Sequence, residues 1–266
     1  MSQKVKGIIL AGGSATRLSE LTRVTNKHLL PVGDFPMIYY PLRALEQAGI
    51  KEVCLITGVE HAGSFIDLLG TGKVIDRQGN QIFDLDITYR MQPNSVMPDG
   101  KLKPGGIPDA IRQARNFAGS DKVVVFLGDN IIEGNIIDSV KKFAEQDGGA
   151  RILLKEVKNP QAYGVPEFDA QGNIINLEEK PSEPKSNFAS IGIYMYDNKV
   201  FDYIETLKPS ARGELEVPDL SKCYLNDGKL SYDILHGWWR DGGQSPRDLA
   251  EISNLIYQTG VNKIRL

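Results

Sequence analysis

The chain has 266 residues and a formal net charge of -3, with 41% apolar and 24% charged residues. This length is enough to bury a sizeable core, and the composition is that of an ordinary soluble globular protein. Charges of both signs are spread along the chain without a basic stripe. That distribution argues against nucleic acid as a partner but not against nucleotides, since a phosphate site needs only a few cations and backbone amides.

The two cysteines, Cys54 and Cys223, are too few for a disulfide framework in a chain of this length. Neither has the neighbours expected of a metal site or an activated nucleophile, so we interpret both as structural. The apolar run after Gly7 has the length of a strand rather than of a leader sequence, and no apolar run is long enough to span a bilayer. We therefore expect a cytoplasmic protein without a membrane partner.

Strand-like and helix-like patterns alternate through the first part of the chain, and this rhythm predicts an α/β fold. The expected type is Rossmann-like, a mainly parallel sheet flanked by helices on both faces. In chain order, the predicted strands and helices are a strand at Val5–Ala11, a helix at Pro36–Gly49, a strand at Lys51–Thr57, a short helix at Ser64–Leu69, a strand at Leu85–Met91, a helix at Ile107–Ala118, a strand at Lys122–Leu127, a helix at Ile136–Gln146 and a strand at Ala150–Val157.

The second half of the pattern is less regular. It predicts a hairpin, with strands at Tyr163–Asp169 and Ile174–Glu179 joined by the turn AQGN. The elements expected after it are a strand at Phe188–Tyr196, helices at Asn198–Leu207 and Glu216–Asn226, a strand at Leu230–Leu235 and a helix at Pro246–Thr259. Because no Pro/Ser-rich linker, low-complexity segment or internal repeat separates the halves, we predict a single domain over residues 1–266.

Glycines follow two of the predicted strands, at the edge where ligands bind in open parallel sheets. Gly12-Gly13 ends the first strand and Gly128-Asp129 ends a later one. The first pair lies in the motif LAGGSATRL, where glycines let backbone amides approach a phosphate chain and Arg17 adds a forked cation. Lys27 adds a point charge ten residues further on. Neither a Walker loop nor a dinucleotide fingerprint is present, and a bare Gly-Gly after a strand is usually only a turn.

Several ordered motifs resemble those of the sugar nucleotidyltransferases, whose signature runs L-A-G-G-x-G-T-R-L-x-P-x-T with a lysine before a P-V/I turn. Within that family the chain looks most like the short-form thymidylyltransferases that act on glucose 1-phosphate. The matching segments extend through the whole chain and are NKHLLPVGDFPMIYYPL, FLGDN, YGVPEFD, LEEKPSEPKSNFAS, KPSARGELEVPDL and GWWRDGG.

The resemblance implies a nucleotidyltransferase that makes dTDP-glucose and pyrophosphate from dTTP and glucose 1-phosphate. The reaction would be an Mg²⁺-assisted in-line attack of the sugar phosphate on the α-phosphate, which needs positioning and charge neutralisation more than covalent help. A homo-oligomer such as a tetramer, and a place in the synthesis of dTDP-sugars for polysaccharide, are also implied.

The resemblance gives catalytic roles to Arg17, Lys27 and Asp129. Arg17 would hold the triphosphate and stabilise the departing pyrophosphate. Lys27 would offset the repulsion between the two phosphate groups that must meet. The metal ligands would be Asp129 and Asp241, because Mg²⁺ is held by a few carboxylates together with phosphate oxygens. On residues alone, a Gly-Asp pair such as Gly128-Asp129 is more often a turn.

Two binding sets follow from the same resemblance. Gln92 would read the pyrimidine edge, because an amide can both donate and accept. Glu179 would accept hydrogen bonds from sugar hydroxyls, and Lys180 would bind the sugar phosphate. On residues alone, Glu178-Glu179-Lys180 is more often a solvated charge cluster. The full nucleotide-binding set is Leu10, Gly12, Gly13, Gln92, Gly105 and Gly106, and the sugar-phosphate set is Tyr163, Gly164, Glu179 and Lys180.

The chain departs from the family pattern at several places, one of which is Glu20 where the signature has Pro. Ala15 stands where the family has Gly, at a cost of about 1 kcal/mol if that position needs a positive φ. Pro108 and Asp109 lie in the base-binding segment, so UTP, or another hexose 1-phosphate, stays an alternative. Gly242 to Ser245 replaces a run that ends in Gly-Thr-His. A non-catalytic sugar-nucleotide sensor is the alternative from another class, and the retained metal carboxylates oppose it.

Overall fold

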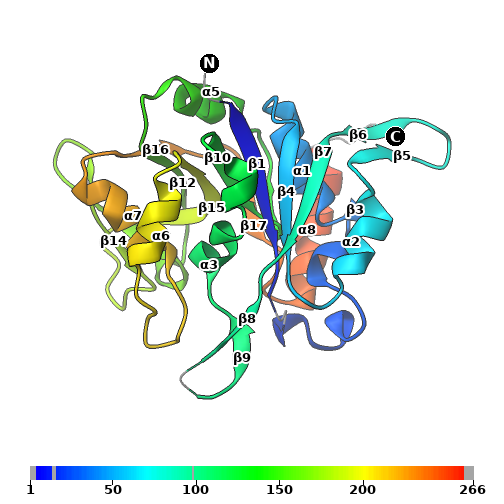
Figure 1. The fold of residues 1–266 in the computed structure, drawn as a ribbon, viewed down its shortest axis with the longest axis horizontal. Helices are drawn as coiled ribbons and strands as arrows, with labels where there is room; N and C mark the ends of the chain where they lie inside the picture. The colour runs from blue at the N-terminus through cyan, green and yellow to red at the C-terminus, as the bar shows by residue number, and fades with distance from the viewer. Residues whose placement is uncertain (1–3, 14–15, 98, 261–266) are drawn as a thin grey trace. The chain divides into compact units, whose positions relative to one another are not determined.

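The structure is a computed structural model that describes residues 4–13, 16–97 and 99–260 (Figure 1). Contacts within the chain group it into two compact units. Unit 1 comprises residues 1–5, 94–125 and 138–235, and unit 2 comprises residues 6–93, 126–137 and 236–266. The single domain expected from the sequence stays a prediction. None of the described helices has the length and apolarity that crossing a bilayer requires.

Unit 2 is built on three parallel strands, β1 (Val5–Ala11), β4 (Glu52–Thr57) and β7 (Asp86–Met91). Figure 1 shows them side by side, and their registers bring the last residues of all three strands together. The second halves of β1 and β4 are fully buried, as expected for parallel strands that are covered on both faces. Loops that follow these strands therefore begin at one edge of the sheet.

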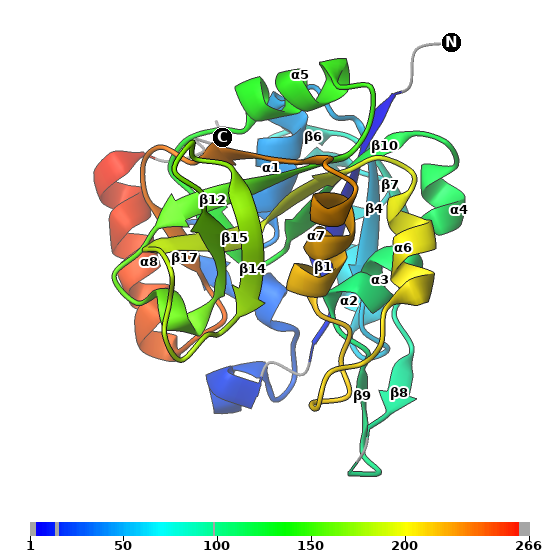
Figure 2. The same cartoon turned by 90° about the vertical axis from the view of Figure 1, so that its left-hand side faces the viewer.

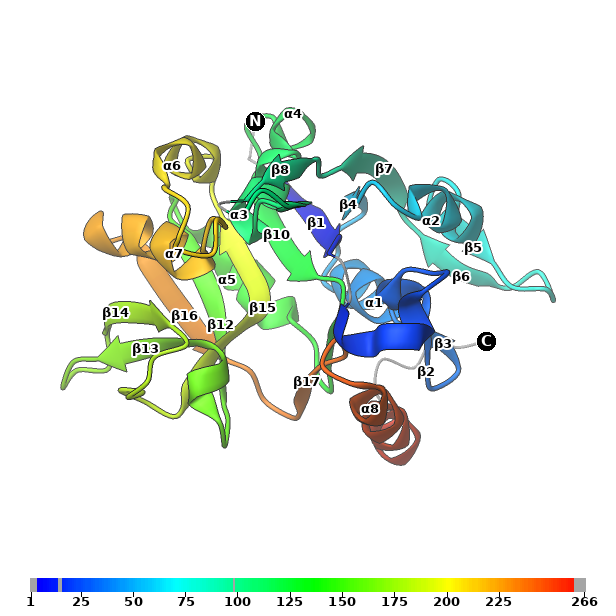
Figure 3. The ribbon, with the colours of Figure 1, turned by 90° about the horizontal axis from the view of Figure 1, so that it is seen from below.

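The other elements of unit 2 are short helices and two-stranded ribbons. They are η1 (Thr16–Thr22), η2 (Lys27–Leu29), β2 (Pro31–Val32), β3 (Phe35–Pro36), α1 (Tyr39–Gln47), α2 (Ala62–Leu69), β5 (Lys73–Ile75), β6 (Gln81–Asp84), β11 (Asn130–Ile132), β17 (Trp239–Asp241) and α8 (Pro246–Thr259). A buried apolar cluster that includes Leu18, Ile131 and Ile252 joins η1, β11 and α8. Figure 3 shows α8 beside β2, and the two are in contact.

Unit 1 contains a mixed sheet around β12 (Ala150–Glu156). This strand pairs antiparallel with β15 (Phe188–Tyr196) and parallel with β16 (Leu230–Ile234). The hairpin of β13 (Gly164–Phe168) and β14 (Ile174–Glu179) joins the sheet through β15 (Figure 2). The hairpin thereby holds the predicted sugar-phosphate residues at its open end.

Helices and one further hairpin complete the described part of unit 1. They are β8 (Asn94–Val96), β9 (Leu102–Pro104), α3 (Ile107–Arg112), α4 (Arg115–Ala118), η3 (Pro160–Ala162), α6 (Val200–Thr206) and α7 (Val217–Asn226). α7 contacts β14, α3 and α6. β10 (Lys122–Leu127) and α5 (Ile137–Glu145) contain two of the points where the chain passes from one unit to the other. Buried Lys122 donates to the carbonyls that end α5 and follow it, so it caps that helix.

The predicted fold class is confirmed: the chain is a mixed α/β protein with parallel strands and flanking helices. β1, β10, β15 and α8 have the predicted bounds. The helix predicted from Pro36 begins instead at Tyr39, because Phe35 and Pro36 pair with the preceding strand β2. The helix predicted over Ile107–Ala118 divides into α3 and α4, since the intervening backbone closes tighter three-residue turns.

Candidate active site

The first group of site residues lies at the carboxyl edge of the parallel strands in unit 2. Gln92 follows β7, its backbone N–H donates to the Thr57 carbonyl at 2.8 Å, and its side chain is buried. A Cβ added to Gly12 would stand 3.6 Å from Gln92 Oε1, so the two residues are neighbours. Gly13 has a φ of +105° and open space where a Cβ would lie. Leu10, in β1 just before these glycines, is buried. The predicted nucleotide contacts in unit 2 thus gather at one edge.

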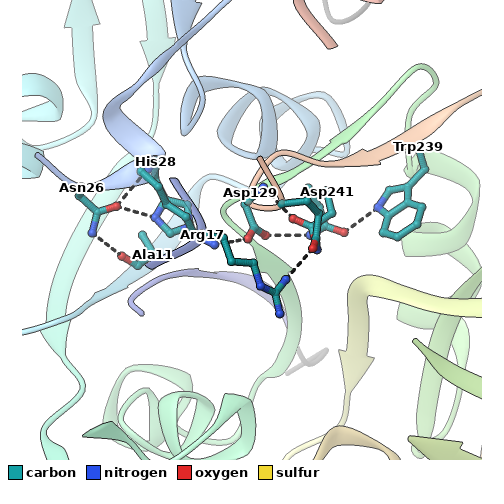
Figure 4. Close-up of polar contacts among 11 residues, drawn as sticks. Ala11, Arg17, Asn26, His28, Asp129, Trp239 and Asp241 are labelled. Atoms are coloured by element: carbon teal, nitrogen blue, oxygen red, sulfur yellow. Dashed lines mark hydrogen bonds and ion pairs between the residues drawn. The ribbon is translucent and has the colours of Figure 1, made fainter. Parts of the chain in front are cut away.

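A buried polar anchor fixes the loop that carries Lys27 (Figure 4). Asn26 donates through Nδ2 to the Ala11 carbonyl at 3.2 Å, and its Oδ1 accepts from the His28 backbone N–H at 3.0 Å. His28 Nδ1 lies 2.7 Å from the same Oδ1, which makes it the protonated ring nitrogen. Burial, and then the Lys27 charge, lower the pKa of His28 to about 3, so this ring is neutral. The anchor ties the Lys27 loop to the end of β1.

Lys27 meets Asp129, the first predicted metal ligand, within unit 2. The chain leaves β10 at Gly128, whose N–H donates to the Leu10 carbonyl at 2.9 Å, and Asp129 follows directly. Lys27 Nζ forms an ion pair with Asp129 Oδ2. Asn130 donates to Asp129 Oδ1 at 2.9 Å and accepts from Trp239 Nε1 at 2.6 Å (Figure 4). Both oxygens of Asp129 are thereby fixed by donors.

Asp241, the second predicted metal ligand, lies at the end of β17. β11 and β17 are antiparallel, with Asn130 opposite Asp241, so their pairing brings Asp241 next to the residue that follows Asp129. The Gly243 N–H donates to Asp241 Oδ1 at 2.8 Å, and Gln244 Nε2 donates to Oδ2. The structure therefore brings together three predicted residues, Lys27, Asp129 and Asp241, from distant parts of the sequence.

In this cluster the Lys27 ammonium faces two carboxylates, those of Asp129 and Asp241. Burial disfavours the charged form of Lys27, but Asp129 and then Asp241 outweigh that cost and raise its pKa above the ordinary value. Burial also disfavours the Asp129 carboxylate, yet the Lys27 ammonium holds the pKa of Asp129 well below its usual range. Burial, and then the Asp129 charge, raise the pKa of Asp241 to about 6. A cation bound here would relieve that repulsion.

Gly243 lies against all three of these groups and leaves no room for a side chain of its own. A Cβ added to it would stand 2.7 Å from Lys27 Nζ, 3.0 Å from Asp129 Oδ2 and 3.2 Å from Asp241 Oδ1. One point thus lies close to both carboxylates, and oxygen donors alone suit a hard divalent cation. Among the described residues, no group of three or more His, Cys, Asp and Glu side chains could hold a metal ion. The pair therefore fits a cation that takes its other ligands from substrate and water.

Arg17 joins the cluster through a side chain that the sequence did not single out. Exposed Arg17 donates from Nη1 to Gln244 Oε1 at 2.5 Å, and Gln244 in turn donates to Asp241. Ala15, the departure from the family pattern, lies outside the described residues.

The sugar-phosphate set forms a second cluster, in unit 1. Gly164 lies opposite Glu179 in the β13–β14 hairpin, and the Lys180 N–H donates to the Tyr163 carbonyl at 2.9 Å. Lys180 Nζ lies 3.5 Å and Arg212 Nη2 lies 4.0 Å from Glu179 Oε1. Burial, opposed by Lys180, raises the pKa of Glu179. All four predicted residues are therefore neighbours.

Lys180 has a strained backbone, with a φ of +49° in a residue that is not glycine. Such strain persists only where the surrounding structure imposes it, and it is concentrated at functional sites. The Pro181 that follows makes the conformation more restricted still. This observation is independent of charge, and it favours a functional interpretation of Lys180 over a solvated charge cluster.

Gly105 and Gly106 have a structural reason to be glycines. The Leu215 N–H donates to the Gly105 carbonyl at 2.9 Å, and Gly106, with a φ of +98°, would clash with the Leu215 backbone if it carried a Cβ. Pro108 and Asp109 occupy the first turn of α3, where proline and an acid are favoured, and Asp109 is buried in an ion pair with Arg112. A contact of Gly105 and Gly106 with the base stays a prediction.

Comparison with known proteins decides the family. The profile of the family described as Nucleotidyl transferase matches residues 6–259. The chain belongs to this family. A glucose-1-phosphate thymidylyltransferase of Neisseria meningitidis is 45% identical over 242 residues, which cover 90% of this chain and 78% of that protein. The prediction of a sugar-1-phosphate nucleotidylyltransferase relationship is confirmed.

Solved nucleotidyl transferases share the fold. A crystal structure assigned as a glucose-1-phosphate thymidylyltransferase from Bacillus anthracis, in complex with a sucrose, is similar with a TM-score of 0.84 and 44% identity, and each chain is covered to 95%. An apo UDP-glucose pyrophosphorylase superposes with a TM-score of 0.81 at 21% identity, covering 97% of this chain and all of that one. The second likeness shows the fold alone.

Sequence reasoning missed three members of these clusters in this nucleotidyl transferase. Arg212 lies in the quoted motif KPSARGELEVPDL, and its charge beside Glu179 could have been suspected from that motif. Asn26 was detectable as a helix-capping residue directly before Lys27. Gln244 lies in the run Gly242 to Ser245 that departs from the family pattern, but nothing in that run indicated a contact with Arg17, because only the folded turn brings the two side chains together.

Proposed function

We propose that this nucleotidyl transferase makes dTDP-glucose and pyrophosphate from dTTP and glucose 1-phosphate. The observation that carries the proposal is the cluster of Lys27, Asp129 and Asp241 at the glycine-rich edge of the unit 2 sheet. A half-buried ammonium beside two carboxylates suits two phosphate groups and a divalent cation. The similarity to glucose-1-phosphate thymidylyltransferases supplies the substrates.

Asp129 and Asp241 are the residues that would hold Mg²⁺, which when bound would neutralise the triphosphate as the pyrophosphate leaves. Lys27 would lie against the α-phosphate and lower the repulsion that meets the incoming sugar phosphate. Its ion pair with Asp129 fixes the ammonium before substrate arrives, so little reorganisation is needed. Arg17 would bind the β- and γ-phosphates through its forked donors.

The reaction needs no enzyme nucleophile. An anionic oxygen of glucose 1-phosphate forms a bond to the α-phosphorus, and the bond from that phosphorus to the bridging oxygen of the β-phosphate breaks. The electron pair of the broken bond leaves with pyrophosphate, so no proton has to be removed from the attacking oxygen. The role of Lys27 and Arg17 is therefore positioning and charge stabilisation.

The unit 1 cluster would bind glucose 1-phosphate. Lys180 and Arg212 both lie near one oxygen of Glu179, and a phosphate would draw their charges to itself. The Glu179 carboxylate would then accept hydrogen bonds from the sugar hydroxyls. Gly164, opposite Glu179, leaves room for the ring, and the Tyr163 backbone would contact it. In unit 2, Gln92 would pair with the thymine edge.

The deciding experiment measures pyrophosphate release by the purified protein with Mg²⁺ and glucose 1-phosphate, offering dTTP, UTP, CTP, GTP and ATP separately. We expect dTTP to give the highest kcat/KM and a product with the mass of dTDP-glucose. A preference for another nucleotide would keep the chemistry and reassign the base. Binding of dTTP without turnover for any hexose phosphate would favour the sensor. The homo-oligomer and the cytoplasmic location stay predictions.

A further inference from the structure

Gln244 occupies a position between a predicted substrate-binding cation and a predicted metal ligand in unit 2. Its Oε1 accepts from Arg17 Nη1 at 2.5 Å, and its Nε2 donates to Asp241 Oδ2. Figure 4 shows Arg17 and Asp241 joined into one polar network. The turn that carries Gln244 is itself fixed on both sides. The Gly243 N–H donates to Asp241 Oδ1 at 2.8 Å, and Ser245 caps α8 by accepting from the Asp248 N–H at 3.1 Å.

An amide is the side chain that suits both neighbours at once. It accepts from the guanidinium and donates to the carboxylate, whereas a carboxylate could only accept and an ammonium could only donate. A direct ion pair of Arg17 with Asp241 would neutralise the charges that the triphosphate and the cation need. The neutral amide of Gln244 restrains both groups and leaves their charges uncompensated.

The restraint matters most for Arg17. Arg17 is a long and exposed side chain, and its guanidinium donates to Gln244. Ordering a long side chain before the ligand arrives lowers the entropic cost of binding. Gln244 lies in the run Gly242 to Ser245, where the sequence departs from the family pattern.

We propose that Gln244 is a positioning residue that holds Arg17 toward the triphosphate and fixes the Asp241 oxygens for the divalent cation. The inference rests on the proposed function, because it assigns the ligands of Arg17 and Asp241 from it. It adds a residue to the site that acts only through its two neighbours.

The test compares wild type with two variants. Gln244→Met keeps the length of the side chain and loses both hydrogen bonds. Gln244→Glu keeps the acceptor for Arg17 and loses the donor to Asp241. Calorimetry measures the Kd of dTTP in EDTA, which reports on Arg17, and then with Mg²⁺, which adds the contribution of Asp241. Steady-state kinetics gives kcat and both KM values.

For Gln244→Met we expect the Kd of dTTP to rise about three- to tenfold in EDTA, with a further loss when Mg²⁺ is present. Gln244→Glu should also weaken dTTP binding in EDTA, because a full carboxylate holds Arg17 in an ion pair. The KM of glucose 1-phosphate and the Tm should match wild type in both variants. Adding Gln244→Met to an Arg17→Met background should leave the EDTA value unchanged.

Wild-type Kd values for dTTP in Gln244→Met, with and without Mg²⁺, would overturn the proposal. A loss that is equal for dTTP and glucose 1-phosphate and that accompanies a lower Tm would show a merely structural role and overturn it as well. Wild-type protein that releases no pyrophosphate would refute the proposed function instead, since the binding comparison does not depend on turnover.

Discussion

Gly243→Ala places one methyl group at the point where Lys27, Asp129 and Asp241 converge. The methyl would stand 2.7 Å from Lys27 Nζ and 3.0 Å from Asp129 Oδ2. Ordinary contact begins at 3.4 Å, so the ammonium must withdraw by about 0.7 Å or the turn must move. The φ of Gly243 is not among the positive values, so alanine itself is compatible with the backbone.

The expected loss is catalytic. A displacement near 1 Å can cost about 10²-fold in rate, and removal of one charge-stabilising contact costs about 10² to 10³-fold. We therefore expect the kcat for pyrophosphate release from dTTP and glucose 1-phosphate to fall about 10² to 10³-fold. The circular dichroism spectrum and the KM of glucose 1-phosphate should stay close to those of wild type, because the substitution does not contact the unit 1 cluster.

The matched control is Gly242→Ala, in the same turn. Its methyl would meet Met37 Cε at 2.8 Å, the end of a flexible thioether that can give way, and the Asp129 carbonyl oxygen at 3.3 Å, which is only 0.1 Å inside ordinary contact. This variant should lose about 1 to 3 kcal/mol of unfolding free energy through overpacking and keep kcat within about threefold. Wild-type kcat in Gly243→Ala, or an equal loss of kcat in both variants, would refute the reasoning.

Three further predictions follow from single contacts. Glu179→Gln should raise the KM of glucose 1-phosphate by about 10- to 100-fold in steady-state assays and leave the KM of dTTP unchanged, because a charged acceptor for sugar hydroxyls is lost. The pKa of His28 is about 3 in the folded protein and 6.5 ordinarily, so the unfolded chain binds the extra proton as pH falls below about 6.5. We therefore expect the unfolding free energy of wild type to fall more steeply than that of His28→Gln between pH 6 and pH 4. The difference in slope should be up to about 1.4 kcal/mol per pH unit, measured by urea titrations in EDTA. Lys122→Met should cost about 2 to 4 kcal/mol of unfolding free energy in the same titrations, because it leaves the carbonyls that end α5 without a buried donor.

Each of these predictions has its own control. Glu178 is exposed and adjacent to Glu179, so Glu178→Gln should leave both KM values unchanged, and a shift as large as that of Glu179→Gln would contradict the assignment. Parallel pH slopes for wild type and His28→Gln would show that the ring is not held neutral. If Lys122→Met changed a KM rather than stability, its capping role would be wrong.

The element pattern could be predicted because each strand is a local property of its residues. β1, β10 and β15 are apolar runs with clear ends, so hydrophobic pattern alone gave their bounds. The three-residue strands β11 and β17 could not be found that way. They are too short to show a period, and only their pairing across more than 100 residues of sequence defines them. These two strands carry the residues that bring Asp129 and Asp241 together.

The residues of the site could be predicted where they lie in motifs that resemble those of a known family. Lys27, Asp129, Asp241, Glu179 and Lys180 were all named, and the structure groups them within their units. Their environment could not be predicted, because burial and neighbouring charge set it. The raised pKa of Asp241 and the Lys27 ion pair depend on which groups face one another after folding. The contacts of Gln244 with Arg17 and Asp241 could not be predicted for the same reason.

The most direct measurement is pyrophosphate release from dTTP and glucose 1-phosphate by wild type, Asp129→Asn and Asp241→Asn across a range of Mg²⁺ concentrations. Each substitution keeps the size of the side chain and removes one charge that would hold the cation. We predict folded proteins whose kcat at saturating substrate is lower by orders of magnitude, with wild type silenced by EDTA. Near-normal turnover in either variant, or wild-type activity that persists in EDTA, would contradict the account.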